Sequence, residues 1–593
     1  MCGIVGYIGK ERCIPKIISG LESLEYRGYD SAGIAYKIDN EIVVKKEEGR
    51  INNLKELVNF EENSCLGIGH TRWATHGKPC KVNSHPHQVG HITLVHNGII
   101  ENYEELKKEL KDYVFKSETD SEVVAALIDK LYEETHDMLK VLNELKNYLK
   151  GSYALGILND DDNKLYAIRK DSPLIIGRSE DGNFIASDVP AILEYTNKYS
   201  LLLNDEYAVL DDLEVKIYCN GTLVDKDVLT FEGNREAAMK NGYEHFMLKE
   251  IFEQDKVVLD TINYYLKDIS KLKEVMAGLE KYDAIDIVGC GSAYHVGLVG
   301  KSLLERYGKI VVNVDVASEY RYVEHIYLKK HLLIVISQSG ETADTLAVLR
   351  KAKELGIDTL AIVNVIGSSI AREADKVIYT KAGIEIAVAT TKAYTCQLLT
   401  LSMMALYLGI KNNILIEDAI ELYKELPNYI KEILDNQEDV KKVAELIYKS
   451  DDIFYLGRQI DYALAMEASL KLKEVSYIHS EAYAAGELKH GTISLIEEGM
   501  PVLTIVTNNE IKDKTLSNVK EVCARGALSI IITNQDIQDK KIYKEIIKVP
   551  DISDLLGSIL VVIKCQLISY YVAKLRNCDI DKPRNLAKSV TVE

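Results

Sequence analysis

The chain has 593 residues, of which 47% are apolar and 27% charged, and it carries a formal net charge of -19. This length allows several globular domains, and the negative charge argues against a nucleic-acid backbone as a partner. The ten cysteines form no CxxC pair and no Cys/His cluster at zinc spacing, and no basic segment followed by an apolar core opens the chain. These features predict a cytoplasmic protein with free thiols and no secretory signal.

The first informative residue is Cys2, because removal of Met1 would leave its thiol and a free α-amine on one residue. An α-amino group has a pKa near ~7.7–8.0, so it can accept the thiol proton at neutral pH. The resulting thiolate would be a strong nucleophile. Taken alone, Cys2 fits this role and that of a small buried apolar residue equally well.

Three segments downstream suit acyl transfer from an amide: residues 69–77, 96–102 and 118–120. Asn97 and the backbone N–H of Gly98 can donate to a developing oxyanion. The planar fork of Arg72 matches an α-carboxylate, and Asp120 offers a countercharge for an α-ammonium group. Considered singly, Arg72 and Asp120 are more typical of solvated or ion-paired surface residues.

Together with the runs 2–6 and 24–33, these segments resemble the glutaminase domain of the amidotransferases with an N-terminal nucleophile. The resemblance implies an αββα sandwich over residues 2–220. Strand-like runs at 92–95 and 153–158, with a helical stretch at 121–131, agree with sheets covered by helices.

The same resemblance implies roles for individual residues of this domain. Cys2 is the nucleophile, and Asn97 and Gly98 form the oxyanion hole. Trp73, the only tryptophan of the chain, gates the passage of ammonia. The glutamine-binding positions are Arg72, Trp73, Thr75, His76, Asn97, Gly98 and Asp120.

A polar stretch over residues 221–243 predicts a linker, and apolar strands then alternate with amphipathic helices, as in parallel α/β sheets. The pattern occurs twice and predicts two similar lobes, at 244–420 and 440–593. A Rossmann dinucleotide site is disfavoured, since neither glycine turn completes GxGxxG. The predicted strands lie at 284–288, 332–336 and 360–363 in the first lobe, and at 453–456, 502–506 and 528–532 in the second.

An uncharged stretch at 393–410 is long enough to touch the threshold for a membrane span. It contains four polar residues and lies between βα units. The sequence therefore favours a buried helix that covers a sheet, and no association with a membrane is expected.

The first lobe carries a candidate phosphate site at Ser337-Gln338-Ser339-Gly340-Glu341-Thr342, directly after an apolar strand. We expect a helix to start here, with Thr342 in its first turn. Backbone N–H groups at a helix N-terminus favour anions. A capping turn without a ligand is the alternative.

In the second lobe, Glu467, Lys471 and Glu474 are spaced to lie on one helical face. A partly buried carboxylate such as Glu474 suits proton transfer between two neighbouring carbons of a sugar. From the spacing alone, an ordinary Glu–Lys helix pair is the simpler interpretation.

Residues 26–31, the polar loop of the first lobe, the segments 468–474 and 482–491 and the C-terminal tail resemble the family of the isomerizing glutamine–fructose-6-phosphate aminotransferases. By this resemblance Glu474 transfers the proton between C1 and C2, Lys471 assists, and Lys588 forms a Schiff base with the ketose. His490 opens the sugar ring and comes from the neighbouring subunit, which implies a homodimer. The sugar-phosphate positions are Ser292, Ser337, Gln338, Ser339, Thr342, Val388 and Ala587.

Ala293 departs from the serine that is usual in this family, so one hydroxyl contact to the phosphate is in doubt. The resemblance implies no metal and no organic cofactor. We therefore expect an α/β and α+β multidomain enzyme that makes glucosamine 6-phosphate and glutamate from fructose 6-phosphate and glutamine. The alternatives are another amidotransferase with an N-terminal nucleophile, which would need an acidic pyrophosphate-binding loop, and a sugar-phosphate sensor with a vestigial glutaminase.

Overall fold

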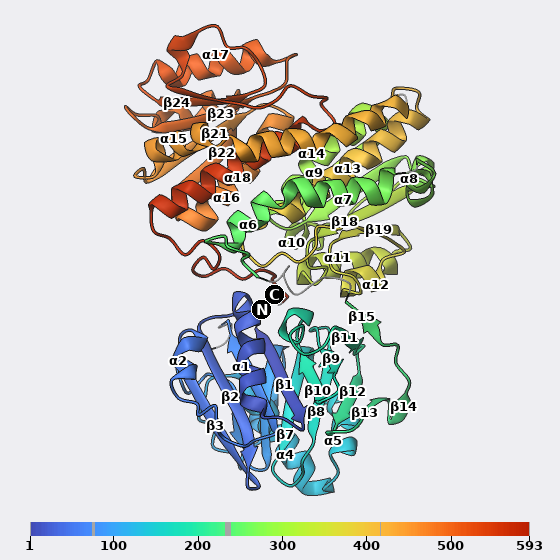
Figure 1. Cartoon of the computed structure of the whole chain (residues 1–593). Coiled ribbons are helices and arrows are strands. Elements are labelled where there is room, and N and C mark those ends of the chain that lie inside the picture. The colour runs from blue at the N-terminus through green and yellow to red at the C-terminus, as the bar shows by residue number, and fades with distance from the viewer. Residues whose placement is uncertain (1, 74–76, 232–238, 268, 416, 592–593) are drawn as a thin grey trace. The chain divides into compact units, whose positions relative to one another are not determined.

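The computed structural model of the chain describes residues 2–73, 77–231, 239–267, 269–415 and 417–591 (Figure 1). Contacts between residues divide the chain into two compact units. The first comprises Met1–Ala238 together with Ala587–Glu593, and the second comprises Met239–Leu586. The C-terminal tail therefore groups with the N-terminal part of the chain.

The first unit contains two antiparallel sheets, one of eight strands and one of seven. Their strand orders are β15-β11-β9-β10-β1-β4-β2-β3 and β14-β13-β12-β8-β7-β6-β5. The strands are β1 (Gly3–Gly9), β2 (Ser31–Ile38), β3 (Glu41–Glu48), β4 (Leu66–Arg72), β5 (His87–Val89), β6 (Ile92–Ile100), β7 (Gly151–Asn159), β8 (Leu165–Lys170), β9 (Ile175–Arg178), β10 (Gly182–Ala186), β11 (Lys198–Leu201), β12 (Glu206–Leu210), β13 (Val215–Cys219), β14 (Thr222–Val224) and β15 (Leu229–Thr230).

Helices cover the outer face of each sheet. The helix α1 (Cys13–Leu24) packs on β1 and β4, and α4 (Asp120–Thr135) packs on β5 and β6. Between the sheets, Ile4 and Ile68 join Val95 and Leu158 in one apolar cluster. This arrangement confirms the predicted αββα sandwich. The other helices of this unit are α2 (Ile51–Lys55), α3 (Tyr103–Glu109) and α5 (Met138–Leu145).

The first part of the predicted linker is structured. Strand β14 pairs with β13, and β15 pairs with β11, so residues 222–224 and 229–230 extend the two sheets. The polar composition of this stretch is explained by its position at the edges of both sheets, where one side of each strand faces solvent.

The second unit contains two five-stranded parallel sheets with the orders β17-β16-β18-β19-β20 and β22-β21-β23-β24-β25. Numbered within each lobe, both orders read 2-1-3-4-5, which is a doubly wound arrangement. The strands are β16 (Ala284–Gly289), β17 (Val311–Val316), β18 (His331–Ser337), β19 (Asp358–Val363), β20 (Lys376–Tyr379), β21 (Asp452–Gly457), β22 (His479–Ala484), β23 (Pro501–Val506), β24 (Leu528–Thr533) and β25 (Glu545–Lys548).

The similarity of the two lobes extends to the backbone of the turn after the first strand. Gly291 has φ 55° and ψ -124°, and Gln459 at the corresponding turn has φ 54° and ψ -122°. This conformation favours glycine, yet the second lobe holds it with a glutamine. The shared topology and the shared turn confirm the predicted repeat.

Helices pack on both sides of these sheets and join the two lobes through one continuous hydrophobic core. The helices are α6 (Phe246–Phe252), α7 (Gln254–Leu266), α8 (Ile269–Met276), α9 (Ser292–Leu303), α10 (Ala317–Tyr320), α11 (Ala343–Glu354), α12 (Ser369–Glu373), α13 (Lys392–Lys411), α14 (Ile420–Asp435), α15 (Glu438–Ile447), α16 (Ile460–Ser476), α17 (Lys512–Cys523) and α18 (Gly557–Leu575).

Two of these helices, α13 and α18, are long and apolar enough to cross a membrane by composition alone. Both are buried inside the unit, with 94% and 83% of their apolar windows covered. Of the two lysines in α18, the buried Lys564 pairs with Asp439 at 2.9 Å. The prediction of a buried helix over residues 393–410 is therefore confirmed.

Candidate active sites

Cys2 directly precedes β1 and is half-buried. Strand β1 pairs antiparallel with β4 in the register Gly3 to Thr71, which brings Trp73 beside Cys2. The Trp73 N–H donates to Cys2 Sγ at 3.3 Å. Gly28 lies in the segment just before β2. A Cβ on Gly28 would lie 2.6 Å from the Trp73 nitrogen, so only glycine lets this segment approach the Trp73 backbone so closely.

Asn97, on β6, contacts the same residue from the second sheet. Its Nδ2 donates to the carbonyl oxygen of Cys2 at 2.9 Å. His70 Nε2 lies 3.0 Å from both Asn97 Oδ1 and the carbonyl oxygen of His96. Because both partners are acceptors, Nε2 carries the hydrogen, and Asn97 must turn Oδ1 to His70 and Nδ2 to Cys2. The next residue, Gly98, has φ 136°.

Arg72 and Asp120 are both buried, with exposed fractions of 4% and 5%. The alternative of solvated surface residues is therefore wrong. Arg72 donates to the carbonyl oxygen of Gly77 at 3.3 Å, and Asp120 Oδ2 accepts from the Ile100 N–H at 2.9 Å.

The charges of this site act on one another. Burial lowers the pKa of Arg72, while Cys2, Asp30 and Asp120 work to raise it. Burial also raises the pKa of the Cys2 thiol, while the Trp73 N–H and Arg72 oppose this rise. A thiolate at Cys2 thus depends on these positive neighbours. The predicted glutamine-binding residues Thr75 and His76 lie outside the described residues.

Sequence reasoning missed a stack of buried histidines behind Asn97. The rings of His70 and His85 are stacked with centroids 4.2 Å apart, and His87 lies edge-on to His85 at 4.8 Å. Burial lowers the pKa of His70 to about 3 and that of the other two well below the ordinary value, so all three are neutral. The His-Pro-His run at 85–87 was the available signal.

In the second unit, the polar loop after β18 lies beside the turn after β16. In a sheet of this order, the gap between the first and third strands is where ligands bind. Ser337 Oγ lies 3.0 Å from Thr342 Oγ1 and accepts from the Gly340 N–H at 3.0 Å. The Glu341 N–H donates to Ser339 Oγ at 3.2 Å.

The helix α11 begins at Ala343, so the expectation that Thr342 lies inside its first turn is wrong. Thr342 occupies the cap position with φ -67° and ψ 120°, which is extended backbone. The chain turns earlier, at Gly340 with φ 65°. Gln338 lies in this loop next to Ser337.

The two lobes are connected by Glu467, which is fully buried on α16. From α9 of the first lobe, Ser292 Oγ donates to Glu467 Oε1 at 2.9 Å and His295 Nδ1 donates to Oε2 at 2.8 Å. Lys471 lies 3.6 Å from Glu467 and 2.5 Å from Glu474. The helical spacing indicated the Glu–Lys–Glu face, but the link to Ser292 and His295 had no sequence signal.

Lys471 is almost completely buried, whereas the Glu474 side chain is 20% exposed. Burial works to lower the pKa of Lys471, but Glu474 and Glu467 outweigh it and hold the pKa above its ordinary value. Lys471 is therefore charged, and it holds the partly exposed Glu474 carboxylate in place. The predicted partial burial of Glu474 is confirmed.

The other predicted sugar-site residues are spread over both units. Val388 is 9% exposed, and its N–H donates to the carbonyl oxygen of Asp581 at 3.0 Å. His490 ends a short 3-10 helix (Glu487–His490) and is exposed. Ala587 and Lys588 belong to the first unit. A site shared by Lys588 and Glu474 stays a prediction.

Two domain families match the chain. The model described as "Glutamine amidotransferase domain" matches residues 80–194. The model described as "SIS domain" matches twice, at residues 278–407 and 446–575. The two SIS matches fall on the two parallel-sheet lobes. The glutamine amidotransferase match falls on the antiparallel sandwich.

Full-length relatives and one solved structure agree with these matches. The proteins named glutamine–fructose-6-phosphate aminotransferase [isomerizing] from Clostridium acetobutylicum and Clostridium tetani are each 50% identical to this chain, over 100% of both chains. The C-terminal domain of glucosamine-fructose-6-phosphate aminotransferase from Francisella tularensis is 38% identical, with a TM-score of 0.54, over 58% of this chain and 99% of that structure. The chain belongs to the family of the isomerizing glutamine–fructose-6-phosphate aminotransferases.

Proposed function

We propose that this chain transfers the amide nitrogen of glutamine to fructose 6-phosphate and releases glucosamine 6-phosphate and glutamate. The observation that carries the proposal is the position of Cys2 directly before β1, where its sulfur accepts a hydrogen bond from the Trp73 N–H. Identity of 50% over the whole length of two aminotransferases supports the same reaction.

In the first half-reaction, removal of Met1 exposes the α-amine of Cys2, which takes the thiol proton. The thiolate attacks the glutamine amide carbon, and the oxyanion forms opposite the donors Asn97 and Gly98 N–H. Collapse of this intermediate gives a thioester and ammonia, and water then releases glutamate. Arg72 and Asp120 bind the α-carboxylate and α-ammonium groups of the substrate, with Thr75 and His76 completing the site.

Ammonia then passes inside the protein, gated by Trp73. In the second half-reaction the phosphate of the sugar is held by Ser292, by the hydroxyl groups of the 337–342 loop and by Gln338, while Val388 and Ala587 line the site. His490 of the neighbouring subunit opens the ring. Lys588 forms an imine with the ketose. Glu474 then moves the proton between C1 and C2, and Lys471 positions that carboxylate.

In this assignment Ser292 binds the phosphate of the sugar, although in the structure its hydroxyl already has a hydrogen-bond partner. Ser292 donates to Glu467 at 2.9 Å, so a hydroxyl that binds phosphate must exchange a buried carboxylate for the ligand. Ala293, beside it, has no hydroxyl to share this task.

We also propose that the enzyme is a cytoplasmic homodimer. All ten cysteines are free, which suits a reducing compartment. The exposed position of His490 suits a residue that serves a neighbouring subunit.

The proposal is tested by incubating the purified chain with fructose 6-phosphate and glutamine labelled with nitrogen-15 in the amide. We expect the label to appear in glucosamine 6-phosphate with stoichiometric glutamate. Binding of fructose 6-phosphate without any labelled amino sugar would indicate a sensor and contradict the proposal. Label transfer only when phosphoribosyl pyrophosphate replaces fructose 6-phosphate would indicate a different amidotransferase.

A further inference from the structure

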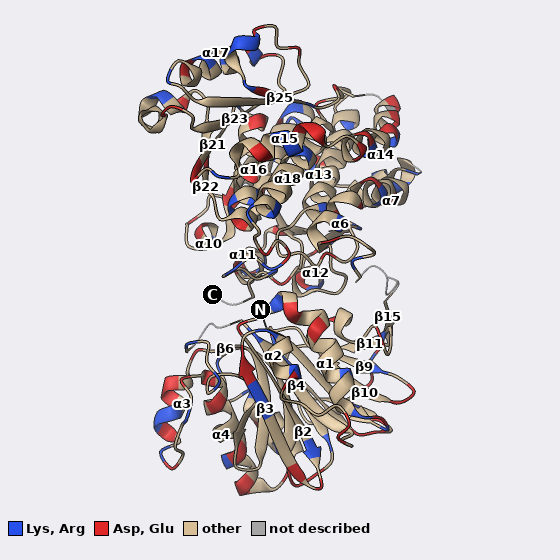
Figure 2. Cartoon of the chain, turned by 60° about the vertical axis from the view of Figure 1, so that its left-hand side comes forward, with Lys and Arg blue, Asp and Glu red and all other residues tan. Residues whose placement is uncertain are grey.

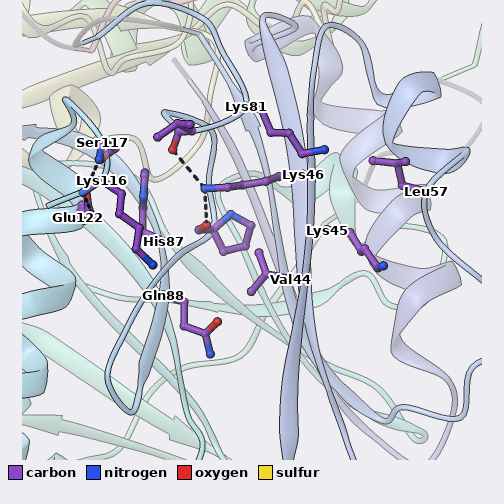
Figure 3. Close-up of a pocket in the computed structure, with 12 residues that line it drawn as sticks. Val44, Lys45, Lys46, Leu57, Lys81, His87, Gln88, Lys116, Ser117 and Glu122 are labelled. Atoms are coloured by element: carbon purple, nitrogen blue, oxygen red, sulfur yellow. Dashed lines mark hydrogen bonds between the residues drawn. The ribbon is translucent and has the colours of Figure 1, made fainter. Parts of the chain in front are cut away.

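The first unit contains a cavity of about 590 Å³ that holds none of the predicted glutamine-binding residues. It lies at β3 and β5, the edge strands on one side of the two sheets. The segments at 81–82 and 116–117 complete its wall (Figure 3). A volume of this size is typical of small-molecule sites.

The lining of this cavity is strongly basic. Its twelve residues include four lysines, Lys45, Lys46, Lys81 and Lys116, and one acidic residue, Glu122. The whole chain carries a net charge of -19, and acidic and basic residues are interspersed over both units (Figure 2). Because Lys45 points to the other face of β3 and Lys81 pairs with Glu47, the positive charge that faces the cavity comes chiefly from Lys46 and Lys116.

The single acidic residue, Glu122, offsets part of this charge and works to raise the pKa of Lys46. Glu122 Oε1 accepts from the Lys116 N–H at 2.8 Å and Oε2 accepts from the Ser117 N–H at 2.5 Å, so its carboxylate is bound to backbone. Among the described residues, no carboxylate lies within ion-pair distance of the Lys45 or Lys116 ammonium group, while Lys81 pairs with Glu47 at 2.9 Å.

Lys46 is the anchored cation of the cavity. Its Nζ donates to the carbonyl oxygens of Ser84 at 2.7 Å, and of Val82 and Pro86 at 3.3 Å each. Figure 3 shows Lys46 and Lys116 extending from two different segments toward the same space beside His87. Lys45 points to the other face of β3, as alternation along a strand requires.

The cavity also offers apolar and neutral polar surface. Val44, Leu57 and Val82 form apolar parts of the wall, and Gln88 and Ser117 supply an amide and a hydroxyl. A ligand that fits this lining has an anionic group for the ammonium groups and a less polar body. Lysine binds phosphate as a compact point charge.

We propose that this cavity is a binding site for a small phosphorylated metabolite, separate from the glutamine and sugar sites. Its wall at His87 is continuous with the imidazole stack that ends at Asn97. The ligand would thus lie next to His87, at one end of the row His87, His85 and His70. The other end of this row contacts Asn97, the proposed oxyanion donor.

The test is isothermal titration of pyrophosphate into the full-length variant Ser337→Ala/Ser339→Ala, which weakens the proposed sugar-phosphate loop, with saturating glutamate present to fill the proposed glutamine site. We expect one pyrophosphate to bind per chain. The double variant Lys81→Gln/Lys116→Gln should bind at least tenfold more weakly. Its matched control is Lys108→Gln/Lys111→Gln, two exposed lysines of the same unit outside the cavity, which should stay within twofold of the original chain.

Absence of pyrophosphate binding under these conditions would overturn the proposal. Equal weakening of pyrophosphate binding in both double variants would also overturn the proposal, because it would show that binding depends on the net charge of the chain and not on the lysines of the cavity. Citrate serves as the second ligand, since it carries similar charge without phosphorus. Citrate binding as tight as that of pyrophosphate would overturn the assignment to phosphorylated metabolites.

Proton uptake by Lys46 distinguishes an anion bound in the cavity from one bound elsewhere on the surface. Burial lowers its pKa to about 8; Glu122 and Cys80 oppose this, and Lys116 and Arg72 add to it. A bound anion favours the charged amine, so binding should take up protons at pH 8 and not at pH 6.5. Titration in two buffers of different ionisation enthalpy measures this uptake, and its absence at pH 8 would place the anion elsewhere.

Discussion

The substitution Glu467→Gln removes the charge that joins the two parallel-sheet lobes while keeping the shape of the side chain. In the native structure the carboxylate accepts hydrogen bonds from Ser292 and His295 and lies 3.6 Å from the Lys471 ammonium group. The amide of glutamine can accept through one atom only, so one of the two donors loses its acceptor.

The expected cost follows from these contacts. Loss of one partner of a buried ion pair costs about 3–5 kcal/mol when the other charge is left alone. Here Lys471 keeps Glu474 at 2.5 Å, so we expect the free energy of unfolding of the second unit to fall by about 2–3 kcal/mol, close to one charged hydrogen bond. The control Glu438→Gln removes an exposed carboxylate that pairs with Lys441 and should cost about 0–1 kcal/mol.

The assay is urea unfolding of both variants, combined with the rate of fructose 6-phosphate isomerisation and the rate of glutamine hydrolysis. With Glu467 neutral, Lys471 binds Glu474 alone and makes it a weaker base, so isomerisation should fall at least tenfold while glutamine hydrolysis is unchanged. The reasoning is refuted if Glu467→Gln is as stable as the Glu438→Gln control and isomerises within twofold of the original rate.

Four further outcomes are expected. Cys2→Ala should abolish glutamine hydrolysis and glutamine-dependent synthesis but keep synthesis from added ammonia; glutamate release at the original rate would exclude Cys2 as the nucleophile. Ser339→Ala should raise the KM for fructose 6-phosphate about tenfold or more, since hydrogen bonds to charged groups contribute about 1.5–3 kcal/mol, and an unaltered KM would remove the loop from phosphate binding. Borohydride added with fructose 6-phosphate should attach the sugar to Lys588, and Lys588→Arg should lose synthesis and keep glutaminase activity; an unmodified tail peptide together with an active Arg variant would contradict the imine. His70 is neutral in the folded chain with a pKa of about 3, but in the unfolded chain it binds a proton below its ordinary value of ~6.5. Acidification from pH 6.5 toward 3 should therefore lower the stability of the first unit, by about 1.4 kcal/mol per pH unit from this residue, and His70→Gln should reduce the measured slope by that amount.

The strands and helices of the two lobes were predictable because their hydrophobic patterns are local. The run 332–336 became β18 (His331–Ser337), and the spacing of Glu467, Lys471 and Glu474 placed them on α16. Where the prediction failed, at Thr342, the loop turns at Gly340 with positive φ and continues through Thr342, so the helix begins at Ala343. A Cβ at Gly340 would lie 2.0 Å from Ser368 Oγ, so this position needs glycine for space as well as for its positive φ.

The candidate sites were only partly predictable. The sequence by itself determined which chemical groups are present, since Cys2, Arg72 and the hydroxyl-rich loop are readable as residue types in a meaningful order. It also determined the repeat of the two lobes, because each strand–helix pattern follows from its own residues. Only the tertiary structure decided which groups meet. Trp73 reaches Cys2 across 71 residues, and His295 reaches Glu467 across 172. Contacts at such separations are set by strand pairing and by helix packing, which no local periodicity encodes.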